Sequence, residues 1–62
     1  MDNRELKLAE DIRISCIEAV KDGFNDASMS GLCMDGAMEA AISAVQKLDL
    51  TKLIEKHQKN EL

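Results

Sequence analysis

The residues of this 62-residue chain best suited to bind a metal or transfer a proton are Cys33, Asp35, Glu39 and His57. Asp35 and Glu39 are four residues apart, so a helix would place both carboxylates on one face. Helical zinc sites use close pairs of histidine or cysteine ligands, and the sequence has no such pair. We therefore expect no metal and no cofactor. Cys33, Asp35 and Glu39 remain candidate ligands of an alternative, a small-ligand or metal-binding module at an oligomer interface.

Residues 26–31 match the first half of the calcium-binding loop of an EF-hand. Asp26, Ser28 and Ser30 offer oxygen atoms at loop positions one, three and five, and Gly31 follows at position six. The match ends there, because position twelve needs a bidentate glutamate and is Ala37. We interpret the segment as a hydroxyl-rich turn and helix cap.

Nucleophilic catalysis has little support in this sequence. It needs a nucleophile, a base and a group that orients the base, and Cys33 with His57 is the one conceivable pair. Free cysteines usually act as small buried hydrophobic residues, and we expect this of Cys16 and Cys33 without a disulfide between them. We predict that the chain is not an enzyme.

The composition excludes several classes of partner. Twelve acidic and eight basic residues give a net charge of −4, which repels a nucleic-acid backbone, and Phe24 is the single aromatic residue available for stacking on bases. No apolar run approaches the ~20 residues of a membrane span, and the first residues lack the apolar core of a secretory signal. We expect a cytoplasmic protein with no nucleic-acid or membrane partner.

The helical spacing of the apolar residues predicts one small domain over residues 1–62. An amphipathic helix is predicted from Arg4 to about Gly23, capped by Asp2 or Asn3, and the Gly-, Asn-, Asp- and Ser-rich segment 22–31 is predicted to be the bend. Ser30 is the expected cap of a second helix.

The second helix is rich in small residues. They let a neighbouring helix approach closely, and close packing is predicted for the set Gly36, Ala37, Ala40, Ala41 and Ala44. Met34 and Met38 fall in its apolar arc and are expected in the core. Asp49 then offers the cap of a short third helix, in which Leu53 and His57 share an apolar face.

The segment from Gly31 to Ala41 reads G-L-C-M-D-G-A-M-E-A-A, and L-D-L follows at residues 48–50. This segment resembles short bacterial proteins that carry the pattern G-L-C-x-x-G-x-x-E-x-A with a following L-D-L. The resemblance covers mainly residues 30–50. It implies a small bacterial helical protein with no established activity.

We conclude that the fold is all-α: a helical hairpin with a short third C-terminal helix, assembling as a helical bundle. Two helices and a short third cannot cover such wide apolar arcs, so we expect a homo-oligomer, with a dimer favoured. A monomeric three-helix domain and a subunit that awaits a different protein are the alternatives. The expected interface comprises Ile12, Cys16, Val20, Met34, Met38, Ala41, Ile42, Val45 and Leu48.

Overall fold

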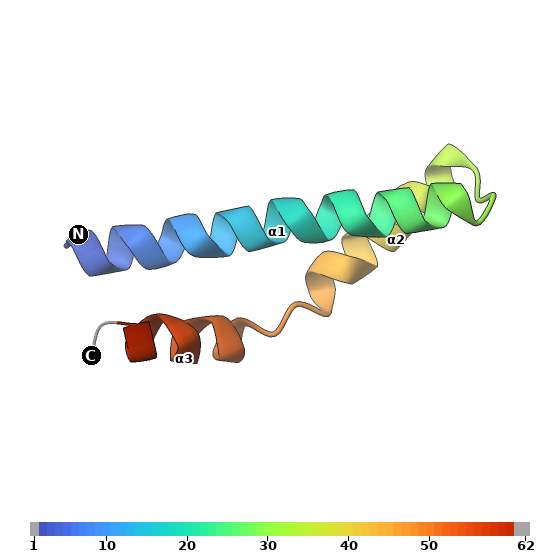
Figure 1. The fold of residues 1–62 in the computed structure, drawn as a ribbon. Helices are drawn as coiled ribbons and strands as arrows, with labels where there is room; N and C mark the ends of the chain where they lie inside the picture. Colours follow the sequence, from blue (N-terminus) through green and yellow to red (C-terminus); the bar gives the residue numbers. More distant parts are fainter. Residues whose placement is uncertain (1, 61–62) are drawn as a thin grey trace.

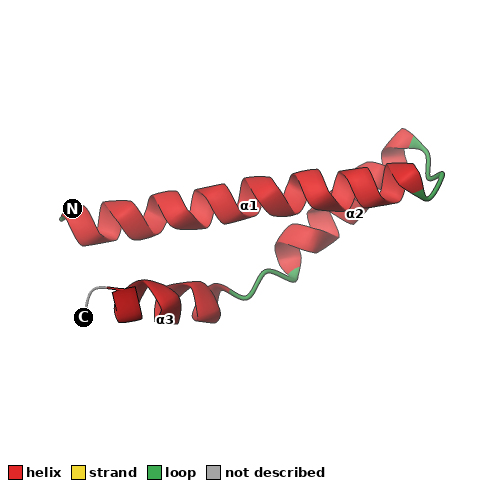
Figure 2. Cartoon of the chain, in the orientation of Figure 1, coloured by secondary structure: helices red, strands yellow, loops and turns green. Residues whose placement is uncertain are grey.

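The computed structural model of the protein describes residues 2–60, and these form three helices joined by two short loops, with no strand among them (Figures 1 and 2). They are α1 (Asn3–Met29), α2 (Met34–Gln46) and α3 (Leu50–Asn60). Helices α1 and α2 form a hairpin, and α3 returns beside the N-terminal half of α1 (Figure 1). The predicted all-α hairpin with a short third helix is confirmed.

Helix α1 begins where the sequence predicts. The carboxylate of Asp2 accepts a hydrogen bond from the backbone N–H of Glu5 at 2.9 Å, which satisfies one of the amides left unpaired in the first turn. The helix then runs for 27 residues, or about 40 Å at 1.5 Å per residue. It spans almost the whole molecule, whose longest dimension is 44 Å.

The predicted bend at residues 22–31 is wrong, because α1 continues through most of this segment to Met29. The apolar period does not stop at Gly23, and Ala27, four residues later, is one of the buried side chains. The polar residues Asp22, Asn25 and Asp26 occupy the exposed side of the same turns. A residue type that favours turns is compatible with a helix when its side chain points to water.

The helix ends in a Schellman motif centred on Gly31. Gly31 has φ of 88°, which a residue without Cβ adopts at little cost. The N–H of Leu32 donates to the carbonyl of Ala27 at 3.0 Å, and that of Gly31 donates to Ser28 at 3.1 Å. These two bonds satisfy the last carbonyls of α1 and turn the chain towards α2.

The role predicted for Ser30 is also wrong. Ser30 is the last residue of the α1 cap, and its hydroxyl donates to the carbonyl of Asp26 at 3.0 Å. The residue that caps the start of α2 is Cys33, whose side chain makes no capping hydrogen bond. A single glycine turn therefore separates the helices, in place of the longer bend that the composition indicated.

The hairpin is held together by small side chains. The buried residues of the described chain are Ala27, Ala37 and Ala41, with exposed fractions of 6%, 0% and 5%. Gly23 lies at the crossing of α1 and α2, where a Cβ atom added to it would be 2.9 Å from the carbonyl oxygen of Ala40. The predicted close packing of the second helix is confirmed for Ala40, Ala41 and Ala44, which meet α1 at this point, whereas Gly36 lies against Leu32 and Cys33 instead.

Helix α3 is anchored at its start as predicted. The carboxylate of Asp49 accepts a hydrogen bond from the N–H of Lys52 at 3.1 Å. Leu53 and His57 are half-buried on the side that faces α1, whereas Leu50 and Ile54 are exposed. The third helix thus covers one side of the N-terminal half of α1 and leaves part of its own apolar face in solvent.

The molecule is open for its size. Its radius of gyration is 14.3 Å, whereas a compact domain of 62 residues has a value of about 11 Å. The accessible surface is 5156 Å², against about 4,000 Å² for a compact monomer of the same mass. The single chain therefore leaves on the order of 1,000 Å² more surface in water than a compact fold of this length.

Candidate functional site

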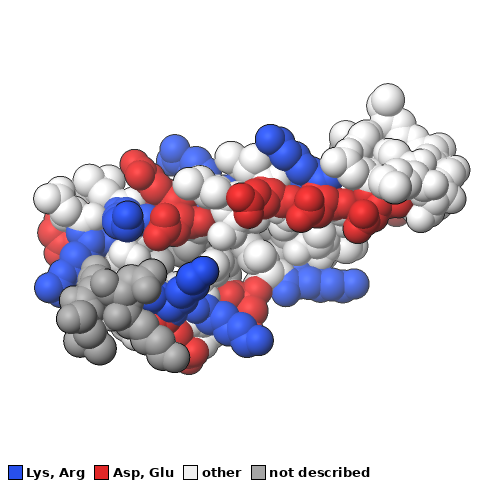
Figure 3. Space-filling view, viewed as in Figure 1, with Lys and Arg blue, Asp and Glu red and all other residues white. Residues whose placement is uncertain are grey.

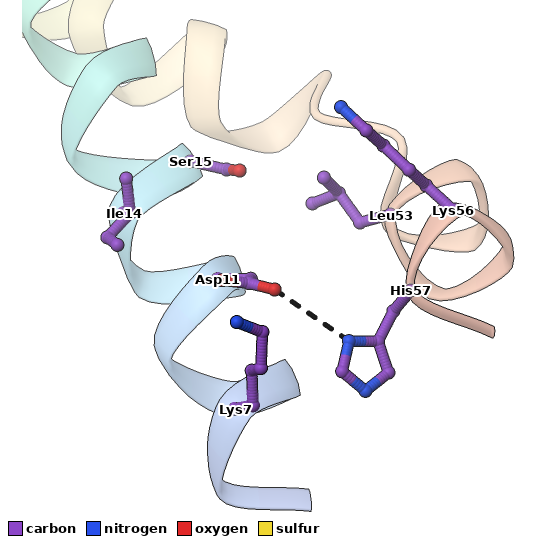
Figure 4. A pocket seen from close by; sticks show the side chains of 7 residues that line it. All are labelled: Lys7, Asp11, Ile14, Ser15, Leu53, Lys56 and His57. Carbon is purple, nitrogen blue, oxygen red and sulfur yellow. Dashed lines mark ion pairs between the residues drawn. The ribbon is translucent and has the colours of Figure 1, made fainter. Parts of the chain in front are cut away.

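The chain offers two kinds of candidate site: a pocket between α1 and α3, and an apolar surface on the outer side of the hairpin. The pocket has a volume of about 340 Å³ (Figure 4). It is lined by Lys7, Asp11, Ile14, Ser15, Leu53, Lys56 and His57.

An ion pair between Asp11 and His57 bridges the two helices across this pocket. The Nδ1 atom of His57 lies 3.7 Å from the Oδ2 atom of Asp11 (Figure 4). The side chain of His57 is 10% exposed and that of Asp11 is 47% exposed, so the carboxylate remains in contact with water. The pair helps to fix α3 against α1, with the modest energy expected of an interaction open to solvent.

Ser15 lines the same pocket, so the pocket contains a serine, a histidine and an aspartate side chain. Their arrangement does not match that of a hydrolytic triad. In a triad the carboxylate orients Nδ1 and the hydroxyl faces Nε2. Here the His57 ring turns Nε2 away from Ser15, whose hydroxyl lies on the far side of Asp11 (Figure 4). The geometry supports a packing role for His57, which also agrees with its place on the apolar face of α3.

The second candidate site is an apolar surface made of large side chains that the hairpin leaves in solvent. On α1, Ile17 and Val20 are 47% and 43% exposed, and on α2, Met38 and Ile42 are 56% and 52% exposed. We call these four residues the outer stripe. A groove of about 290 Å³ lies on α1 within it, lined by Cys16, Ile17, Val20 and Lys21.

The outer stripe and α3 lie on different sides of α1. Successive residues of a helix are about 100° apart, so Ile17 is about 200° from Ser15, which lines the pocket against α3. Figure 3 shows a row of acidic side chains along α1. Glu18, Asp22 and Asp26 repeat at intervals of four residues and are exposed. Asp22 is seven residues from Ser15, so this acidic ridge continues the side of α1 that faces α3 into the C-terminal half of the helix. Helix α1 therefore has one side that carries α3 and the acidic ridge, and an opposite apolar side that is uncovered.

The predicted interface residues fall into three groups in the structure. Val20, Met34, Met38 and Ile42 are exposed, and Ile12, Cys16, Val45 and Leu48 are half-buried. Ala41 is buried against α1 within the single chain, so its side chain has little surface to offer a second one. The expected core positions of Met34 and Met38 are wrong, with exposed fractions of 74% and 56%, because the alanines of α2 occupy the contact with α1.

The candidate metal ligands are not brought together. Cys33, Asp35 and Glu39 are all exposed, and the described part of the chain contains no group of three histidine, cysteine, aspartate or glutamate residues suited to hold a metal ion. The expected burial of Cys33 is wrong because the residue lies in the connection at the end of the hairpin. Both cysteines are free thiols, as predicted, and Cys16 is half-buried.

The pairing of Asp11 with His57 was not predicted from the sequence. The two residues are separated by most of the chain, and each has an ordinary place on its own helix, one on a polar face and one on an apolar face. No spacing in the sequence singles out Asp11 from the other acidic residues of the first helix as the partner of His57.

Comparisons with protein-family models, curated proteins and solved structures give no significant match to this chain. Within residues 2–60, no helix combines the length and the apolar character needed to cross a membrane.

Proposed function

We propose that this chain is a cytoplasmic bacterial protein that self-associates as a homodimer and acts through protein–protein contacts. The observation that carries the proposal is the distribution of its apolar residues. Among the residues that the structure describes, the three buried hydrophobic side chains are alanines, whereas the large aliphatic residues of the outer stripe lie in water. A folded protein gains most of its stability from burying such large side chains, so a single copy lacks the usual source of stability.

The surplus surface has the size of a protein interface. Each chain exposes on the order of 1,000 Å² more surface than a compact monomer of its mass. Each partner of a stable complex buries about 800 Å². A hairpin that buries one such face against a copy of itself forms a helical bundle, the usual solution for two-helix units. The two free cysteines support a reducing compartment, and the pattern from Gly31 to Ala41 supports a bacterial source.

Sedimentation equilibrium tests the proposal directly. Interference optics are required because the chain has no Trp or Tyr to absorb near 280 nm. We expect a mass of twice 6.9 kDa at micromolar concentration. A folded species with the mass of one chain across the whole concentration range contradicts self-association.

The chain offers a matched pair of variants that separates the outer stripe from exposed apolar residues in general. Ile17 and Leu50 are aliphatic residues of the same size, with exposed fractions of 47% and 48%. Ile17 belongs to the outer stripe, whereas Leu50 is the first residue of α3. We expect Ile17→Glu to dissociate the dimer and Leu50→Glu to leave its mass unchanged.

The size of the effect follows from burial. Burying a fully exposed isoleucine side chain contributes about 1.5–3 kcal/mol, and Ile17 is 47% exposed in the single chain, so about half of this contribution remains for the dimer. A two-fold dimer contains two copies of each position, and the loss corresponds to a dissociation constant raised at least about 10-fold. Equal dissociation by both variants would show that the outer stripe is not the interface.

A further inference from the structure

The two helices of the hairpin differ greatly in length, and this difference leaves a second uncovered surface. Helix α1 has 27 residues and α2 has 13, so α2 lies along only one half of α1. Gly23 marks that half, because it meets α2, and the buried Ala27 follows four residues later on the same side of α1. Ala9 and Ile12 continue the same side of α1 into the other half, where Ala9 is exposed and Ile12 half-buried.

From this mismatch we infer that the dimer is antiparallel, with its two-fold axis near Cys16 at the middle of α1. The inference rests on the self-association proposed above and specifies its geometry. Pairing two copies of α1 in opposite directions brings the half that lacks α2 beside the α2 helix of the second copy. The exposed Met38 and Ile42 then cover Ala9 and Ile12 of the other chain. In this way each copy covers the half of α1 that its partner's own α2 leaves uncovered.

The groove on α1 supports an axis at this position. It is lined by Cys16, Ile17, Val20 and Lys21, and residue 16 is the midpoint of a helix that runs from residue 3 to residue 29. An apolar groove at the centre of an antiparallel pair receives a side chain from the facing helix, as in knobs-into-holes packing. In a two-fold pair the same groove on the second copy receives the equivalent side chain.

Charge complementarity favours the antiparallel direction. Glu10 and Lys21 are eleven residues apart, which is close to three helical turns, so both lie on the same flank of the outer stripe. Their midpoint falls between residues 15 and 16. In an antiparallel pair Glu10 of one chain therefore faces Lys21 of the other, and this pairing occurs twice. The acidic ridge of Glu18, Asp22 and Asp26 stays outside the interface, where its like charges do not meet.

The two native cysteines report the direction of the pairing. Cys16 lies near the proposed axis, so the two copies of Cys16 come close together. Cys33 lies beyond the end of α1, about 20 Å along the helix from residue 16. Two copies of Cys33 are therefore separated by about 40 Å in an antiparallel dimer, whereas a parallel dimer brings them to the same end.

The experiment uses single-thiol variants of the full chain and a short bis-maleimide cross-linker. Cys33→Ser keeps only Cys16, and Cys16→Ser keeps only Cys33, which is exposed and so accessible to the reagent. We expect covalent dimer from Cys33→Ser and at least tenfold less from Cys16→Ser. Labelling with a monofunctional maleimide confirms that both thiols react, and loss of cross-linking in denaturant confirms that the folded dimer is required.

Each outcome has one meaning. Efficient cross-linking through Cys33 shows a parallel pair and overturns the inference. A protein that sediments as a dimer but does not cross-link through Cys16 places the axis elsewhere and also overturns it, while self-association stands. A protein that sediments as a monomer removes self-association itself, and the inference with it.

Discussion

Replacing Gly23 by alanine adds one methyl group at the point where α1 and α2 touch. The added Cβ would lie 2.9 Å from the carbonyl oxygen of Ala40, 3.0 Å from Cβ of Ala44 and 3.1 Å from Cα of Ala41. All three are atoms that no side-chain rotation can move away, so the helices must separate to accept the methyl group. Their separation loosens the contacts of the buried alanines around the crossing.

Two opposing effects set the magnitude. Alanine is preferred to glycine inside a helix by about 1 kcal/mol, whereas adding a methyl group to a fully packed site costs about 1–3 kcal/mol. Gly36 provides the control, because a Cβ atom there would first meet Cβ of Leu32 at 3.5 Å, an ordinary contact distance. Gly36→Ala gains the helix preference without the overpacking. We therefore expect Gly23→Ala to be less stable than Gly36→Ala by about 1–3 kcal/mol.

Urea denaturation followed by helical circular dichroism measures this difference. All proteins must be compared at the same chain concentration, because association adds to the apparent stability. Gly36→Ala should unfold at the same or a higher urea concentration than the parent chain, and Gly23→Ala at a lower one. Equal stability of the two variants would refute the close approach of α1 and α2 at Gly23.

Three further measurements test other parts of the fold. Gly31→Ala should lower the free energy of unfolding by about 1 kcal/mol in the same urea assay, because Gly31 has φ of 88° and L-residues are strained there; an unchanged midpoint argues against the Schellman turn. Ala41→Leu should cost about 1–3 kcal/mol, since Ala41 is 5% exposed at the helix crossing, and a neutral result would place it outside that contact. Hydrogen exchange should be faster in α3 than in the central turns of α1, and Asp49→Ala should accelerate it further, because α3 packs along one side of α1 only. Equal protection of both helices would contradict this.

The sequence predicted the three helices and the capped starts of α1 and α3 because these depend on neighbours in the chain. Asp2 and Asp49 each bond an amide three residues ahead, and the apolar spacing within each helix is read over a few turns. The bend predicted at residues 22–31 was wrong because that prediction also used only local information, the types of residue in the segment. Glycine, asparagine and aspartate favour turns on average, but Gly23 is required inside α1 by the backbone of α2, which contacts it from about twenty residues away.

A signal for this crossing was present in the sequence at a different spacing. Ala19, Gly23 and Ala27 repeat at intervals of four, as do Ala37 and Ala41, and two such stripes of small residues indicate helices in close contact. Pairing the two stripes identifies Gly23 as part of a helix. The Asp11 and His57 pair offers no comparable signal, since it depends on the direction in which α3 leaves the loop at residues 47–49.

The same choice of small residues explains why large apolar side chains lie outside the hairpin. With alanine and glycine between α1 and α2, the helix axes approach closely and no space remains there for Met38 or Ile42. These residues must then point away from the contact, to the side where α1 presents Ile17 and Val20. A thin hairpin with an apolar outer side is therefore suited to form one half of a helical bundle. The contact between α1 and α2 fixes the angle between the two helices, and the outer stripe supplies the large residues for the core of the bundle. We therefore expect substitutions in the contact between α1 and α2 to change the stability of each chain, and substitutions in the outer stripe to change the affinity between chains.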